Sequence, residues 1–237
     1  MKTRIGTGVL LAVCAAFSWS GALASTTNCL NPAHYLKTGG SHPLSLAEPA
    51  EDRVYLRFQT GWASKYECEG LDLWDGSLCA FVPEIQYREW VGKIWYGVST
   101  DHQNHAELKY RLDYVKELGN WTVMPWYEHS FVFPGDKGIP RPGLKTTYRF
   151  SDRWFAGTDL YWQYNNHTFR GYYAAFAGLH EEIADCVRVD ATIRYGYNGG
   201  YVGPVVHHGS NALDYNLSFT FRATSRLTVE LLSLIHI

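Results

Sequence analysis

The sequence predicts an all-β chain folded as an antiparallel transmembrane β-barrel, and three observations support this prediction. Residues 105–118 and 121–133 alternate apolar and polar side chains with a period of two, which is the period of a strand and not of a helix. Each stretch is at least as long as the roughly 9 to 11 residues that a tilted strand needs to cross a bilayer. Short turns follow every second predicted strand, whereas the clearly long loops all follow strands of the other set, as in outer-membrane barrels.

A soluble β-sandwich is the alternative. Its apolar faces would pack on a second sheet and its charged faces would meet water, whereas in a membrane barrel the apolar face meets lipid and the charged face lines the lumen. A sandwich gives no reason for loops to sort by end, and this favours the barrel. The aromatic residues near strand ends also suit the interfacial girdles of a membrane protein: Trp90, Trp121, Phe133, Phe150, Trp154, Trp162, Tyr164 and Tyr197.

Composition narrows the class of protein. The formal net charge is -2, so the chain has no basic field for nucleic acid. Aromatic residues make up 16% of the chain, a heavy load of amphipathic rings. No apolar run outside the N-terminus reaches the length of a membrane-spanning helix, so a membrane-spanning form of this chain would cross with strands.

The N-terminus carries the features of a secretory signal peptide. Lys2 and Arg4 precede an apolar core over 8–19, and Ala22-Leu23-Ala24 is a small-x-small cleavage site. Residues 1–24 are therefore predicted to be a signal peptide, which indicates export.

The remaining chain divides into a tail and a barrel. Residues 25–52 are polar and broken by proline and glycine, so they are predicted to form a periplasmic N-terminal tail, and 53–231 the outer-membrane barrel. Pro83 weakens the second strand because it cannot donate to a ladder. The predicted strands are 53–61, 78–88, 91–99, 105–118, 121–133, 143–150, 154–164, 168–180, 186–197, 212–222 and one beginning near 226.

Eleven strands cannot close a bacterial barrel, which has an even number of strands. We therefore expect about 12 strands in the intact protein, with the last strand missing from this sequence. The final residues, 232–237, resemble the translation of an adapter used in sequencing libraries, so we expect a non-native tail and a native reading frame that ends near Leu231.

Export makes disulfides the expected state of the cysteines. Four cysteines outside the signal peptide allow three pairings. We favour Cys68 with Cys79, which lie in or beside one loop, and Cys29 with Cys186, which fall at the same end of the barrel. No CxxC spacing supports a zinc site. Cys14 hints at a lipoprotein box, although Val13 before it does not have the small size that such a box requires.

Two stretches resemble the TorF-type porin family. One is 64–66 (Ser-Lys-Tyr) followed by 70–72 (Gly-Leu-Asp), and the other is 107–114 (ELKYRLDY) followed by 117–121 (ELGNW). In that family a Ser-x-Tyr, aromatic, Arg-Gly segment follows the first strand, and a Glu-Leu-Asp-Tyr strand precedes a short glycine turn. Here 67–69 (Glu-Cys-Glu) replaces the aromatic residue and the arginine. The resemblance implies an outer-membrane barrel and identifies no catalytic residue.

The charged faces of the predicted strands are expected to line a lumen. Both signs occur in similar number, and mixed charges give weak ion selectivity. This predicts a porin for passive diffusion of small polar solutes, with outer-membrane lipid as its surroundings and no cofactor. The predicted lining residues are Glu107, Lys109, Arg111, Asp113, Glu128, Lys145, Arg149, Asp159, Arg188, Asp190, Arg194, Asp214 and Arg222.

Two alternatives stay open. If the charged pairs fill the interior, nothing passes, and the barrel would act as a surface receptor or structural protein through its loops 62–77, 134–142 and 198–211. The second alternative is an outer-membrane enzyme. His129 and Ser130 are strand neighbours that point to opposite faces and cannot form a nucleophile and base pair.

Metal sites and catalytic motifs are not expected. His102 with His105, and His207 with His208, lie at predicted outer loops, but neither pair supplies a full ligand set. The sequence has no glycine-rich phosphate loop, no GxSxG and no HExxH. We therefore expect neither catalytic residues nor a metal.

Overall fold

A computed structural model of the chain gives its fold. It describes residues 12–21, 54–63, 66–68, 71–74, 77–100, 106–133, 138–165, 168–184, 186–200, 208–222 and 227–236. The strands in chain order are β1 (Ala12–Gly21), β2 (Val54–Ala63), β3 (Tyr66–Cys68), β4 (Leu71–Trp74), β5 (Leu78–Tyr87), β6 (Trp90–Ser99), β7 (Ala106–Tyr114), β8 (Lys116–Leu118), β9 (Trp121–Phe133), β10 (Ile139–Arg149), β11 (Trp154–Asn165), β12 (Thr168–Ala184), β13 (Val187–Gly199), β14 (His208–Arg222) and β15 (Leu227–His236).

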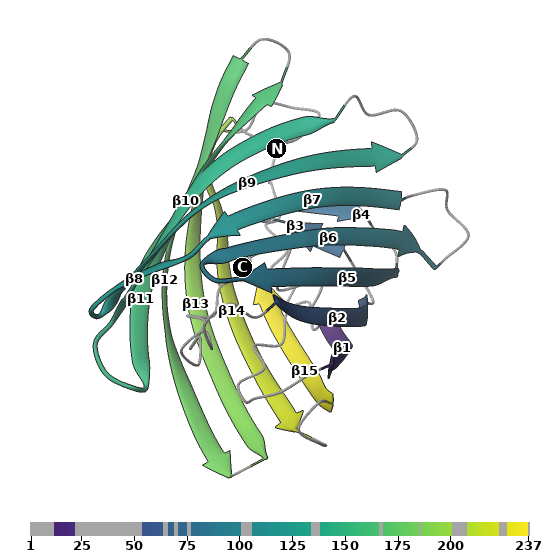
Figure 1. The fold of residues 1–237 in the computed structure, drawn as a ribbon. Helices are drawn as coiled ribbons and strands as arrows, with labels where there is room; N and C mark the ends of the chain where they lie inside the picture. Colours follow the sequence, from purple (N-terminus) through teal and green to yellow (C-terminus); the bar gives the residue numbers. More distant parts are fainter. Residues whose placement is uncertain are drawn as a thin grey trace, which may run out of the picture.

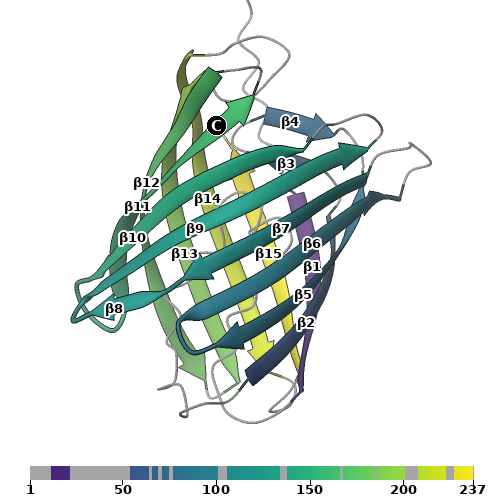
Figure 2. The same ribbon diagram turned by 45° about the horizontal axis from the view of Figure 1, so that its top comes forward.

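One antiparallel sheet of 13 strands closes on itself, which confirms the predicted all-β antiparallel barrel (Figure 1). It closes because β10 pairs with both β9 and β11. Since β7 and β8 both pair with β9, they share one place in the ring, and 13 strands fill 13 − 1 = 12 places. The strands of the near wall run obliquely across those of the far wall (Figure 2), which is the tilt that closure of a barrel requires.

The predicted strands all form, and most differences lie at their ends. The strand predicted over 105–118 divides at Val115 into β7 and β8. Pro83 lies within β5, where it pairs with Phe58 of β2 but has no partner on β6. The missing pair follows from chemistry, since proline has no amide hydrogen to donate.

The predicted loop 134–142 is too long at its C-terminal end. Ile139 to Pro142 belong to β10 and pair with β9. The pairing of β10 with β11 begins only at Gly143, so Pro140 and Pro142 lie on a stretch with a neighbour on one side. Proline is tolerated at such an edge because no second ladder needs its missing donor.

The ring is completed by β1, which lies between β2 and β15. The twelfth place is therefore taken by residues of the predicted signal peptide and not by a further C-terminal strand. Residues 232–236 of the predicted non-native tail belong to β15 and pair with β14 and β1. Pairing in the sheet bears on neither cleavage nor the native reading frame, so both stay predictions. The predicted tail 25–52 lies outside the described residues.

The connections sort only partly by length between the two ends of the barrel, because 166–167 is short at the end with longer links and 22–53, between β1 and β2, is long at the other end. At one end the links are 88–89, 119–120, 150–153, 185–186 and 223–226, and at the other they are 64–77, 100–105, 134–138, 166–167 and 200–207. Gly119 turns the chain between β8 and β9 with a φ of 61°, a backbone conformation that favours glycine. The long link after β2 holds a separate hairpin, β3 with β4, which the sequence analysis does not predict.

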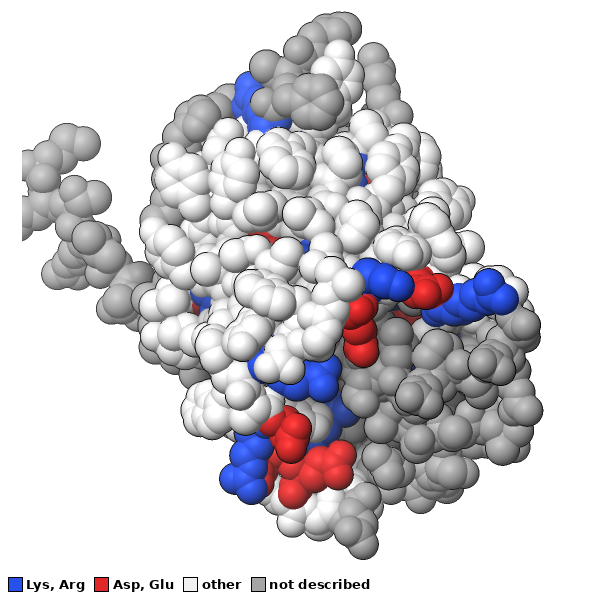
Figure 3. All heavy atoms as spheres, turned by 60° about the vertical axis from the view of Figure 1, so that its left-hand side comes forward, with Lys and Arg blue, Asp and Glu red and all other residues white. Residues whose placement is uncertain are grey.

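Side chains alternate between the two faces of the wall. Buried and exposed residues alternate along β5 from Leu78 to Tyr87, and the exposed ones are mainly apolar. Because the barrel wall is a single sheet, a buried side chain on it faces the interior. The outer wall in Figure 3 is largely uncharged, and most charged side chains in that view gather toward one end. Among the described residues no helix is long and apolar enough to cross a membrane.

The disulfides stay predictions. Cys79 is a half-buried free thiol and Cys186 an exposed one. The side chain of Cys68 and the whole of Cys29 lie outside the described part of the chain.

Candidate pore lining

The charged residues selected from the sequence lie mainly on the inward face. Arg149 and Arg188 are half-buried, and the side chain of Arg222 lies outside the described residues. The period of two places the others on one face of their strands. The buried ones are Glu107, Lys109, Arg111, Asp113, Glu128, Lys145, Asp159, Asp190, Arg194 and Asp214.

Five of the inward side chains form one ion-paired network across β2, β5, β6 and β7. Asp113 accepts from Arg111 Nε at 2.6 Å and lies 2.9 Å from Lys93 Nζ. Lys93 also lies 3.7 Å from Glu84, whose other oxygen is 3.1 Å from Arg57. Each carboxylate is thus shared by two cations, and this offsets the cost of removing the charges from water.

Two further carboxylates on this side are held closely. Glu107 lies 3.2 Å from Lys109 Nζ and accepts a hydrogen bond from Ser130 Oγ at 3.1 Å. Glu128 accepts from Arg141 at 3.1 Å. Opposite charges on β7, β9 and β10 therefore neutralise each other locally.

A row of aromatic rings runs along the inner wall from β9 to β12. The ring centroids of Trp126 and Tyr161 are 5.4 Å apart, and Tyr161 stacks on Tyr172 at 5.2 Å. A guanidinium lies over each end, Arg111 at 4.1 Å from the Trp126 ring and Arg194 at 5.2 Å from the Tyr172 ring. We call Trp126, Tyr161 and Tyr172 the aromatic row.

Glycines on neighbouring strands leave the space that the rings of the aromatic row occupy. A Cβ on Gly143 of β10 would overlap the ring of Trp126, and a Cβ on Gly196 of β13 would overlap the phenol of Tyr172. The rings therefore occupy recesses over these glycines, where a larger residue would overlap them.

Away from the end of the barrel with the short links, charges are paired more loosely on β10 to β14. Arg194 lies 3.9 Å from Asp159 and 4.0 Å from Asp214. Lys145 faces Asp159 across the β10–β11 ladder, yet its Nζ has no hydrogen-bond partner and lies 4.7 Å from the ring of Phe176. This region holds two cations and two carboxylates, and its opposite charges lie farther apart than those on β2 to β9.

The end of the barrel with the short links carries its own charged group. Asp190 accepts from Arg188 Nε at 2.9 Å and is 2.7 Å from Nδ1 of His180. Arg153 and Glu181 pair at 3.1 Å, with Arg153 exposed and Glu181 half-buried. Asp190 and Arg188, both among the predicted lining residues, thus belong to the barrel entrance.

The side chains considered for catalysis lie apart. Ser130 is fully buried, whereas His129 lies on the outer face, stacked on Phe131 with centroids 4.8 Å apart. In the part of the chain that the structure describes, no group of three histidine, cysteine, aspartate or glutamate side chains could hold a metal ion. His102, His105 and His207, and the side chain of His208, lie outside that part.

Sequence reasoning missed several inward residues. Arg57, Glu84 and Lys93 share the alternation that marks the chosen charges, so the face of each strand was a sufficient signal. Arg141 was missed because it fell in a predicted loop. The aromatic row was missed because rings suit a lipid-facing wall as well as a lumen. A glycine opposite the ring, as at Gly143, is the additional signal.

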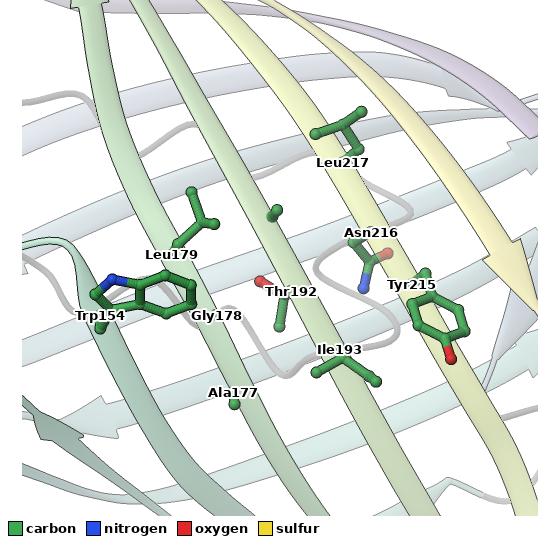
Figure 4. A pocket seen from close by; sticks show the side chains of 10 residues that line it. Trp154, Ala177, Gly178, Leu179, Thr192, Ile193, Tyr215, Asn216 and Leu217 are labelled. Atoms are coloured by element: carbon green, nitrogen blue, oxygen red, sulfur yellow. The ribbon is translucent and has the colours of Figure 1, made fainter.

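The outer wall has an apolar hollow between β11 and β14 (Figure 4). Trp154, Ile193 and Leu217 stand around it, and small residues such as Ala177 form its floor. The hollow is lined mainly by residues of the outward face, and Asn216 of the inward face also borders it.

Taken together, the closed antiparallel sheet, its apolar outer wall and its ion-paired inward face define a β-barrel of the membrane type. No protein-family model and no curated protein matches the sequence, so the resemblance to TorF-type porins stays a prediction. Solved structures that resemble this chain include two of one outer-membrane protein. Outer-membrane-expressed OmpT of Vibrio cholerae is 10% identical, with 100% of this chain and 99% of that chain covered and a TM-score of 0.34. In-vitro-folded OmpT of Vibrio cholerae is 12% identical, with 95% and 76% covered and a TM-score of 0.35. Likeness at this level has no bearing on function.

Proposed function

We propose that the protein is an outer-membrane porin that allows passive diffusion of small polar solutes through a mixed-charge lumen. The observation that carries this proposal is the distribution of side chains around the closed sheet, with apolar residues on the outer face and charged residues on the inner face. Leu112 is 47% exposed on the outer wall, whereas its neighbours Arg111 and Asp113 are 5% and 1% exposed inside. An apolar exterior around a charged interior suits a barrel surrounded by lipid and lined by water.

The lengths of the links at the two ends of the barrel support one orientation of the barrel in the membrane. Outer-membrane barrels have short periplasmic turns and longer outer loops. The short links would then face the periplasm, together with the N-terminal tail 25–52, and the β3–β4 hairpin would lie outside. Exposed Trp90, Trp121 and Trp154 begin strands at the short-link end, where an interfacial girdle would be anchored.

The ion pairs support weak selectivity between solutes. Most inward carboxylates lie within 3.2 Å of a cation, so neither sign forms an unopposed ring. A ring of one sign would be needed for a strong ion filter.

Single-channel conductance in a planar bilayer tests the proposal. Steady ohmic openings are expected from the purified barrel. Trp95→Ala should raise the conductance, since this fully buried ring occupies the inner face of β6. The matched control is Tyr96→Ala, which removes a ring from the outer face of the same strand and should leave the conductance unchanged. Equal effects of the two substitutions would place the current outside the lumen.

A second candidate is a non-conducting barrel that acts as a surface receptor or structural protein through its outer loops. The observation that favours it is the filling of the interior, where Trp95 and Tyr172 are 0% exposed. A barrel that inserts, shows a heat-dependent shift in electrophoretic mobility and stays electrically silent would support this candidate and overturn the porin.

A further inference from the structure

We propose that Lys145 is the centre of a binding site for small oxyanions, such as inorganic phosphate or a carboxylate, on the inner wall formed by β10 to β13. The proposal deepens the proposed function, on which it rests for the access of solutes to the lumen. It names a class of solute that the mixed-charge lining alone does not select.

Lys145 differs from the other buried cations. Its side chain is 3% exposed, and among the described residues its Nζ has neither a hydrogen-bond partner nor an ion pair. Among the buried lysines and arginines that the structure describes, the others are all ion-paired: Lys93, Lys109, Arg111 and Arg194. A buried ammonium group without an acceptor is costly, so an anion that supplies one gains a favourable interaction.

The nearest carboxylate does not neutralise Lys145. Asp159 lies directly opposite Lys145 on β11, where cross-strand side chains are neighbours. Its Oδ2 is nevertheless 3.9 Å from Arg194, and no ion pair joins it to Lys145 within 4.0 Å. Asp159 is thus drawn toward β13, and the ammonium of Lys145 remains available.

Arg194 provides a second cation for the same ligand. Phe176 lies opposite Arg194 in the β12–β13 ladder, and the Phe176 ring lies 4.7 Å from Lys145 Nζ, so both cations border this ring. The contacts of Arg194 with Asp159 and Asp214 are long, at 3.9 and 4.0 Å. A planar guanidinium matches the geometry of carboxylate and phosphate oxygens. An oxyanion has enough acceptors to engage Lys145 and Arg194 together.

The wider interior adds positive field at this position. Arg111 and Lys93, from β7 and β6, act electrostatically on Lys145, as Arg194 does. Asp159 is the one carboxylate with a comparable effect among the described residues. A negatively charged ligand would therefore meet three attractive charges and one repulsive charge at this position.

Isothermal titration of the detergent-solubilised barrel with inorganic phosphate, and separately with acetate, tests the site. Lys145→Met should weaken phosphate binding by about tenfold or more, since it removes a charge-assisted contact. Lys145→Arg should retain most of the affinity. The matched control is Lys109→Met, which removes a buried lysine that already pairs with Glu107 at 3.2 Å and should leave phosphate binding unchanged. A heat-dependent mobility shift identifies the folded variants, and Lys145→Gln replaces Lys145→Met if the latter does not fold.

The Asp159→Asn variant distinguishes an anion-binding site at Lys145 from an ion pair between Lys145 and Asp159. Loss of the competing carboxylate should strengthen phosphate binding. The proposal is overturned if the wild-type barrel binds neither anion, if Lys145→Met binds phosphate as the wild type does, or if Asp159→Asn weakens binding. Titration requires no conduction, so a silent barrel that binds phosphate through Lys145 would overturn the porin alone. A conducting barrel without such binding would overturn the anion site alone.

Discussion

The inner wall of the barrel has two regions that use charge differently. Across β2 to β9, with Arg141 of β10, the carboxylates Glu84, Asp113, Glu107 and Glu128 each have a cation between 2.6 and 3.2 Å away. Across β10 to β14, away from the Asp190 group at the barrel end, Arg194 lies 3.9 and 4.0 Å from two carboxylates, and Lys145 has no ion pair among the described residues.

Charged residues face charged residues in the ladders of both regions. Glu84 faces Lys93 and Arg111 faces Glu128 in the first region. In the second region, Lys145 faces Asp159 and Arg194 faces Asp214. The two regions therefore differ in the distances between opposite charges and not in the kind of residue that faces a charge.

Disrupting the ion pairs of the first region should have the largest effect on the free energy of unfolding. Asp113→Ala leaves Lys93 and Arg111 buried without their shared carboxylate, and loss of one partner of a buried ion pair costs about 3 to 5 kcal/mol. Urea unfolding in lipid vesicles, followed by the electrophoretic mobility shift, measures the change. Stability within error of the wild type would show that water enters the first region and screens the network.

Filling a glycine recess should have the next largest effect. Gly143→Leu displaces the Trp126 ring, and forced overpacking costs about 1 to 3 kcal/mol. Near-ultraviolet circular dichroism should report the loss of the Trp126 and Tyr161 contact. The control is Ala175→Leu on the exposed outer face of β12, where added volume meets lipid and the dichroism should persist.

Weakening the second region should change stability little. Asp214→Asn removes a carboxylate whose contact with Arg194 is 4.0 Å, and the reduced desolvation cost offsets the lost attraction. We expect a change below about 1 kcal/mol by urea unfolding. A loss as large as that from Asp113→Ala would remove the distinction between the two regions.

The smallest effect is expected at the barrel end. Lys116 and Glu89 lie 3.9 Å apart with nearly half of each side chain exposed. Lys116→Ala should therefore alter the free energy of unfolding by no more than about 0.5 kcal/mol. Urea titration of this variant gives the baseline against which the interior substitutions are read.

The sequence predicts the strands well and their partners poorly. The strand over 121–133 has the bounds of β9, because its alternation is long and Gly119-Asn120 sets its start. Alternation assigns a face to each side chain, and so the inward charges could be selected. It cannot tell which cation reaches which carboxylate, because that depends on the register of neighbouring strands.

Other features depend on contacts that no local pattern records. The place of β1 in the ring depends on the edges of β2 and β15, which are distant from it in sequence. The start of β10 at Ile139 depends on the absence of a β11 partner beside Pro140 and Pro142. Local propensity assigns such a stretch to a loop, and tertiary pairing overrides it.

The recesses on the inner wall have a consequence for how the barrel can diverge. Trp126 faces Gly143 directly across the ladder, and Tyr172 lies over Gly196 of the next strand. A larger residue at either glycine is compatible only with a smaller residue in place of its ring. Among homologous sequences, the members of each pair should therefore change together. The width of the lumen would then depend on each glycine and its ring as a pair, and not on either position alone.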